Sequence, residues 1–112
     1  MRNIEDEIVR YLKDNHTGIK NAVPSKDVER HFSISGRTLR KHINNLRQSG
    51  IPICSGKEGY YYAGSQYEIN STAARLGDFI AGILDAKTGL LSAKLFPDEI
   101  KLRVVISFEK DA

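Results

Sequence analysis

Apolar residues recur every three or four positions through the first half of the chain, which is the spacing that lines one face of a helix. This spacing predicts three helices, over residues 4–14, 26–32 and 36–48. The apolar positions that define them are Ile4, Ile8, Leu12, Val28, Phe32, Leu39, Ile43 and Leu46. Each helix follows a residue of a type that caps helix N-termini, namely Asn3, Ser25 and Ser35.

After Gly50 the pattern changes to that of two short strands. The segment IPICS predicts one strand, GKEG a turn and GYYYAG a second strand, so we expect a β-hairpin over residues 51–64. Alternation along the second strand should turn Tyr61 to one face of the hairpin and Tyr60 and Tyr62 to the other.

The rest of the chain, residues 65–112, holds one long helical pattern and one alternating pattern. A polar cluster at residues 70–72 predicts the start of a helix that continues to about Leu95. An alternative ends this helix near Gly89, because glycine weakens helices, and forms a hairpin from the residues after it. Alternation over residues 102–108 predicts a final strand.

The long helical pattern carries an apolar seam with alternating steps of three and four residues, as in a coiled coil. The seam consists of Leu76, Phe79, Ile83, Ala86 and Leu90, and a second stripe beside it consists of Leu84, Leu91 and Leu95. One interpretation is that this helix packs back on its own domain. The other is homodimerisation, which we favour because a domain of about 60 residues has little spare apolar surface to receive a long helix. The predicted dimerisation residues are Leu76, Phe79, Ile83 and Leu90.

The composition is that of an ordinary globular protein, with 112 residues of which 40% are hydrophobic and 28% charged. No apolar run approaches the roughly 20 residues of a membrane span, and the acidic, amphipathic N-terminus does not resemble a secretory signal. A single cysteine, Cys54, cannot form an internal disulfide. We therefore expect a cytoplasmic protein with one core and an appendage.

The formal net charge is only +3, but positive charge is concentrated in the middle of the chain. Residues 34–57 contain no acidic residue and five basic ones, namely Arg37, Arg40, Lys41, Arg47 and Lys57. On a helical wheel the positions opposite the apolar stripe are Arg37, Lys41, Asn44 and Gln48, with Arg40 and Arg47 on the flank. Arg and Lys suit guanine edges and phosphates, whereas Asn and Gln bond adenine, so this face predicts a helix that reads DNA in the major groove.

Three short helices followed by a hairpin is the layout of a winged helix-turn-helix domain. The stretch VPSKDVERHFSISGRTLRKHINNLRQSGIPICSGKEGYYYA resembles the N-terminal domains of bacterial DeoR-type and biotin-repressor-type regulators, and stand-alone phage-encoded winged-helix proteins. The resemblance covers roughly residues 4–64. It implies that the third helix enters the major groove and that the hairpin, or wing, contacts the backbone or minor groove. By the matching positions it implies Arg37, Lys41 and Asn44 at bases and Lys57 at the wing tip.

The expected fold class is therefore α+β, with a winged helix-turn-helix domain over residues 1–64 and a dimerisation extension over residues 65–112. We expect sequence-specific binding of double-stranded DNA by a small transcriptional regulator or phage accessory factor. The expected DNA contacts are Ser35, Arg37, Thr38, Arg40, Lys41, Asn44, Arg47, Gln48 and Lys57. The large effector-binding or enzymatic domain of those regulators does not fit in residues 65–112, so no small-molecule effector is expected. The alternative is an adaptor that binds another protein in a phage or replication assembly.

Other chemistry has little support in the sequence. His16, His31 and His42 share no metal-ligand spacing with Cys54, and no nucleophile stands with a His and an acid in the pattern of a triad. The GKEG turn lacks the glycine spacing and the Ser or Thr of a phosphate-binding loop. We therefore expect no metal, no cofactor and no enzymatic activity.

Overall fold

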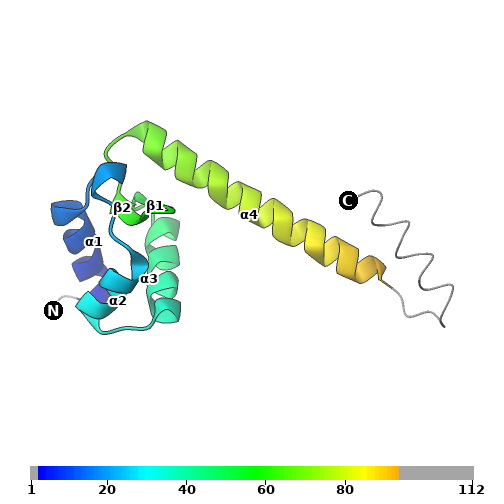
Figure 1. Ribbon diagram of the computed structural model, residues 1–112, viewed down its shortest axis with the longest axis horizontal. Helices are drawn as coiled ribbons and strands as arrows, with labels where there is room; N and C mark the ends of the chain where they lie inside the picture. The colour runs from blue at the N-terminus through cyan, green and yellow to red at the C-terminus, as the bar shows by residue number, and fades with distance from the viewer. Residues whose placement is uncertain (1–2, 94–112) are drawn as a thin grey trace. The chain divides into compact units, whose positions relative to one another are not determined.

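The computed structural model describes residues 3–93, and Figure 1 shows their elements in order. The elements are α1 (Ile4–Asn15), the 3-10 helix η1 (Ile19–Asn21), α2 (Ser25–Phe32), α3 (Gly36–Gln48), β1 (Ile53–Gly56), β2 (Gly59–Tyr62) and α4 (Gln66–Ser92). Within the described residues the fold is thus α+β, with four α-helices and one two-stranded antiparallel hairpin. The three predicted short helices and the hairpin are confirmed, and their order is consistent with a winged-helix-like layout.

Contacts divide the chain into two units, Met1–Gly77 and Asp78–Ala112. The first unit holds α1 to β2 and the first turns of α4, so the boundary that we predict after Gly64 lies inside it. The reason is that Thr72 and Arg75, in the first turns of α4, form hydrogen bonds with Ser55 of the hairpin.

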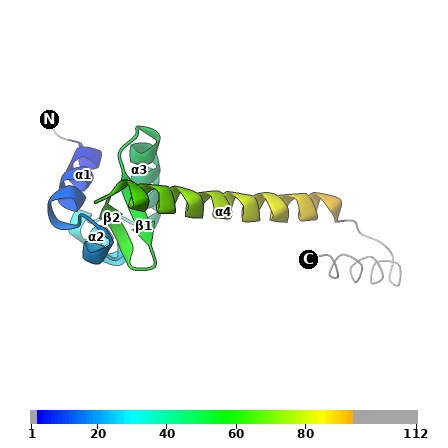
Figure 2. The ribbon, with the colours of Figure 1, turned by 90° about the horizontal axis from the view of Figure 1, so that it is seen from above.

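The core of the first unit lies where α1, α2, α3 and the hairpin meet (Figures 1 and 2). Its buried residues are Ile8, Leu12, Val23, Val28, Leu39, Ile43, Leu46 and Ile53. Most of them come from the helical stripes predicted above, while the stripe residues Ile4 and Phe32 pack against this core and stay partly exposed. Burying one such aliphatic side chain contributes about 1.5–3 kcal/mol, so the core holds the inner side of α3 firmly in place.

The hairpin pairs β1 with β2 in a register that sets Cys54 opposite Tyr61 and leaves a two-residue turn. As the alternation predicts, Tyr61 is buried on one face, while Tyr60 and Tyr62 pack against the core on the other. Val23 forms a one-residue bridge to β2, in which Val23 and Tyr60 exchange two backbone hydrogen bonds of 2.8 Å. This bridge attaches the segment before α2 to the hairpin.

The predicted N-caps of α2 and α3 have different outcomes. Ser35 caps α3 as predicted, because its Oγ accepts a hydrogen bond from the Thr38 N–H at 3.1 Å. The predicted cap at Ser25 is wrong: Pro24 occupies the cap position and Ser25 is the first residue of α2. The Ser25 hydroxyl instead donates to Glu29 Oε2, one turn further along the helix, at 2.8 Å.

The predicted start of α4 is also wrong, since the polar cluster at residues 70–72 lies inside the helix. Ser65 precedes α4, and its Oγ accepts a hydrogen bond from the Glu68 N–H at 3.3 Å. The Glu68 carboxylate reaches back and accepts from the Gly64 N–H at 2.8 Å and from the Ile19 N–H at 3.0 Å. This arrangement resembles a capping box, except that Glu68 accepts from the residue before Ser65, and it also ties the start of α4 to η1.

Further along, α4 passes through Gly89 without interruption and ends at Ser92. The alternative helix end near Gly89 is therefore wrong, and the predicted end at about Leu95 is a few residues late. The strand over residues 102–108 and most of the alternative hairpin lie outside the described residues. No helix within residues 3–93 combines the length and the hydropathy needed to span a membrane.

Candidate nucleic-acid interface

One side of α3 is polar, basic and exposed. Arg37, Lys41, Asn44 and Gln48 all lie on this side and are exposed, whereas the apolar stripe on the other side is buried. We name these four residues the α3 outer face. Their spacing of four, three and four residues gathers them on one strip of the helix, as the sequence predicts.

The positive charges of α3 are largely unneutralised. Among the described residues the ion pairs are Arg30 with Asp27 at 3.6 Å, and His42 with Glu5 at 2.8 Å, and neither involves the outer face. Arg40, on the flank of α3, is exposed, and its side chain lies close to the first turn of the helix. Its Nη1 is 3.4 Å from the position that a Cβ would occupy at Gly36. Arg37 and Lys41 therefore present their charge to solvent or to an external anion. Arg40 lies nearer to a carboxylate, since Glu29 Oε2 would lie 3.0 Å from the same Cβ position.

A hollow of about 350 Å³ lies between α3 and the hairpin, within the first unit. Arg40 and Asn44 line it from α3, Ser55 and Tyr60 from the hairpin, and Ser25 from the first turn of α2. No carboxylate lines this hollow. The Ser25 hydroxyl is already bound to Glu29 Oε2, which leaves the guanidinium and amide groups and the Ser55 hydroxyl. Such groups contact phosphate oxygens in DNA complexes.

Arg47, on the flank of α3, makes contacts inside the protein that the sequence did not predict. Its Nε donates to the Ile53 carbonyl at 2.8 Å and its Nη2 donates to Ser55 Oγ at 3.0 Å, so the half-buried guanidinium ties α3 to β1. Burial lowers the pKa of Arg47, and the neighbouring Arg75 lowers it further, although an arginine still stays charged near neutral pH. Two of its five N–H donors are thus used inside the protein, while Arg47 also lines the hollow between α3 and the hairpin described above. Its phosphate contact stays a prediction beside this structural role.

Ser55 is the point where α3, β1 and α4 are joined. Beside Arg47, it contacts Arg75, whose Nη2 donates to the Ser55 carbonyl and, at 3.0 Å, to Ser55 Oγ. The Ser55 N–H donates to Thr72 Oγ1 at 3.4 Å. The sequence prediction missed this junction. Its only local signal was a Thr and an Arg one turn apart at the start of an otherwise apolar stripe.

The wing tip is the turn between β1 and β2. Lys57 lies there, exposed as predicted, beside the equally exposed Glu58. The tip thus has no net charge of its own, so any DNA contact by Lys57 depends on the flexible side chain reaching a phosphate.

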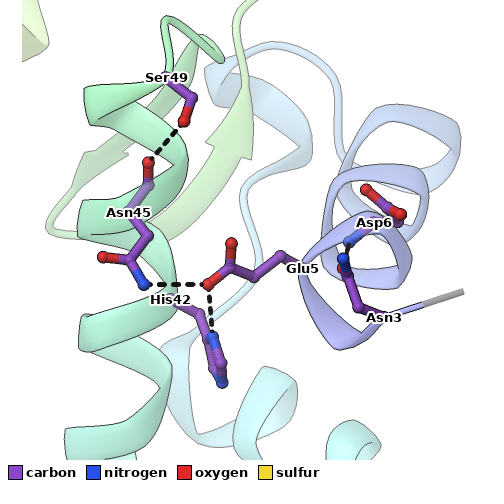
Figure 3. Close-up of polar contacts among 6 residues, drawn as sticks. All are labelled: Asn3, Glu5, Asp6, His42, Asn45 and Ser49. Carbon is purple, nitrogen blue, oxygen red and sulfur yellow. Dashed lines mark hydrogen bonds and ion pairs between the residues drawn. The ribbon is translucent and has the colours of Figure 1, made fainter.

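A polar cluster on the other flank joins α3 to α1 (Figure 3). Glu5 Oε2 lies 2.8 Å from His42 Nδ1 and accepts a hydrogen bond from Asn45 Nδ2 at 3.1 Å. These two hydrogen bonds, His42 first, lower the pKa of Glu5. Ser49 Oγ in turn donates to the Asn45 carbonyl at 3.2 Å. His42 therefore orients α3 against α1 and does not face the outer side.

The remaining candidate groups of the first unit are structural. Burial raises the pKa of the Cys54 thiol and of the Tyr61 hydroxyl, so both stay protonated at neutral pH. His16 Nδ1 lies 2.8 Å from the Asn21 carbonyl, and His31 stacks on Tyr11 with ring centroids 4.2 Å apart. Within residues 3–93 no three His, Cys, Asp or Glu side chains gather closely enough to hold a metal ion.

No protein-family model, curated protein or solved structure matches this chain. Its functional chemistry is therefore inferred from its own residues. They offer one surface suited to a polyanion, made of the α3 outer face, Arg40 and the hollow beside the hairpin.

Proposed function

We propose that this protein binds double-stranded DNA sequence-specifically, as a small transcriptional regulator or phage accessory factor. In this proposal α3 enters the major groove and the hairpin lies against the DNA backbone. The observation that carries it is the α3 outer face, which is exposed, basic and free of ion pairs with the described residues.

The dimensions and the chemistry of α3 support this placement. A helix is about 10–12 Å across with its side chains, which fits a major groove about 12 Å wide. Arg37 and Lys41 can donate to guanine O6 and N7, while Asn44 and Gln48 can bond adenine bidentately. These pairings give the outer face the means to distinguish base pairs.

Phosphate contacts would come from the edges of the same surface. Ser35 and Thr38 lie exposed at the N-terminus of α3, where backbone N–H groups and the helix dipole favour an anion. Arg40 and the hollow between α3 and the hairpin would receive a backbone phosphate, and Lys57 would reach another from the wing tip. These contacts set the register of α3 in the groove but read no sequence.

Selection of bound sites from a pool of random duplexes tests the proposal directly. We expect enrichment of a defined motif, and loss of that enrichment when Arg37 and Asn44 are both replaced by alanine. Binding without any enriched motif would contradict sequence-specific recognition, and no binding at low salt would contradict DNA binding altogether.

The second candidate is an adaptor that binds another protein. One observation favours it: the second half of α4 exposes large apolar side chains, Phe79 and Ile83 among them. A protein that fails to bind duplex DNA at low salt and yet captures a protein partner through α4 would support this candidate over the first.

A further inference from the structure

One apolar stripe runs the length of α4, and its first part is used inside the first unit. Ile69, Thr72, Ala73 and Leu76 line a hollow of about 270 Å³ against the loop after α3 and β1. Thr72 is buried there and Leu76 is partly buried. Leu76, a predicted dimerisation residue, thus already contributes to its own domain.

The second part of the stripe is bare within the described residues. Its members are Phe79, Ile80, Ile83, Leu84, Leu90 and Leu91, each between 57% and 76% exposed. At about 100° per residue they fall within an arc of about 140°, and the positions outside that arc are polar or small. We name these six residues the α4 apolar face. Ile80 and two members of the second stripe join it, so it is wider than the seam predicted from the sequence.

We propose that the α4 apolar face binds the same face of a second copy of this chain, with the two α4 helices antiparallel. The size of the face supports a dimer. At about 100 Å² of buried area each, six such side chains would bury on the order of 600 Å² per copy. The two copies together would bury about 1,200 Å², which is the lower end of the range for specific protein–protein interfaces.

The position of charge on α4 sets the orientation. Lys87 lies near the middle of the apolar face, whereas Asp78 and Asp85 lie on the opposite side of the helix. In a parallel pair in register, Lys87 would face Lys87 of the second copy, and two like charges at close range oppose association. An antiparallel pair crossing at the level of residue 85 separates the two Lys87 positions by about 6 Å along the helix axis, which weakens this repulsion.

The antiparallel register is also self-complementary. If the two helices cross at the level of residue 85 along their axes, Phe79 of one copy lies opposite Leu91 of the other. Ile80 then lies opposite Leu90. Lys87 then lies opposite Ile83, where its aliphatic stem covers apolar surface while its ammonium reaches solvent. The apolar pairs at both ends of the face are thereby buried together.

Sedimentation of the full chain without DNA tests the dimer, so the result does not depend on the proposed function. We expect a dimer at tens of micromolar, and for Ile83→Glu a self-association weaker by roughly 30-fold or more, the loss typical of a central interface residue. Ala81→Glu is the matched control, because it adds the same charge on the opposite side of α4 and should leave the dimer intact. A monomeric parent, or an Ile83→Glu variant that still dimerises, would overturn the inference.

Disulfide cross-linking tests the orientation. In the antiparallel pair residue 79 of one copy faces residue 91 of the other, so a Phe79→Cys, Leu91→Cys double variant should form a covalent dimer on mild oxidation. The single Phe79→Cys variant should not, because its two cysteines would lie about 18 Å apart, beyond the reach of a disulfide. The parent controls for Cys54, which is buried. Efficient cross-linking of the single variant would show a parallel pair and contradict the proposal.

Discussion

At the scale of single residues, Gly59 is the glycine with the least room for a side chain among the described residues. Its φ is +123°, and a Cβ there would overlap the Val23 carbonyl and lie 2.8 Å from Pro24 Cα. The obstacle is backbone on the opposite side of the bridge between Val23 and β2, so no side-chain movement removes it. The close approach of the hairpin to the segment before α2 requires a residue without a side chain.

We therefore expect Gly59→Ala to lower the free energy of unfolding by more than about 2 kcal/mol, since strain and overlap add. Urea denaturation measures this value. Gly50→Ala is the matched control: its φ is +87°, but nothing lies within 4 Å of its Cβ position, so only the strain of about 1–2 kcal/mol applies. Equal losses in the two variants would mean that the overlap with Val23 is relieved at little cost.

Arg37 and Arg47, both in α3, make different contributions. Arg37 is exposed, so Arg37→Ala should leave stability unchanged and cost about 1–3 kcal/mol of binding to a selected DNA site, with relaxed specificity. Arg47 is bound to Ile53 and Ser55, so Arg47→Ala should lower stability by about 1–3 kcal/mol because the Ile53 carbonyl loses its donor. Thermal melting and DNA titration of both variants check the contrast. An Arg47→Ala protein of parental stability that binds every duplex more weakly would contradict the structural role and support the phosphate contact.

At the scale of elements, the contact between α1 and α3 depends on the charge of Glu5. Its pKa in the folded protein lies below the ordinary value of 4.5, because His42 and Asn45 donate to the charged form. The unfolded chain therefore binds this proton at a higher pH than the folded protein does. The stabilisation is complete above the unfolded pKa and is lost as the pH falls through the folded pKa.

We expect Glu5→Gln to reduce the loss of stability between about pH 5 and pH 3, compared with the parent, in urea denaturation at fixed pH values. Glu7→Gln is the control, since Glu7 is an exposed carboxylate on the same helix. If both substitutions change the pH profile equally, the effect is one of net charge and not of the hydrogen bonds to Glu5.

The elements that depend on short-range pattern could be predicted, and those that depend on tertiary contacts could not. Leu39, Ile43 and Leu46 are buried as their spacing predicts, because a helix presents such positions on one side whatever it packs against. The start of α4 could have been predicted from the Ser65 and Glu68 pair, which has the spacing of a capping motif. The pair precedes the apolar stripe on which our prediction of α4 depended.

The internal contacts of Arg47 could not be predicted from a sequence pattern. A helical wheel places this side chain on the flank of α3 but does not show that a carbonyl of β1 lies within its reach. The same holds for Arg75, which meets Ser55 across 20 residues of sequence. The α3 outer face was predictable for the converse reason: its residues need no partner within the chain.

At the scale of the whole molecule, the exposed charges predict how binding depends on salt. Each copy offers four exposed cations to phosphates and bases, namely Arg37, Arg40, Lys41 and Lys57. If all four neutralise phosphate charge, log affinity should fall with log salt with a slope of about −3 to −4 per copy, and of about −7 for a dimer on two half-sites. Titration of a non-specific duplex between roughly 50 and 200 mM salt measures the slope.

Ile83→Glu, which removes the proposed dimer contact but none of these cations, should halve the slope of the parent. Equal slopes would mean that only one copy contacts DNA, and a slope near zero would point to the adaptor instead.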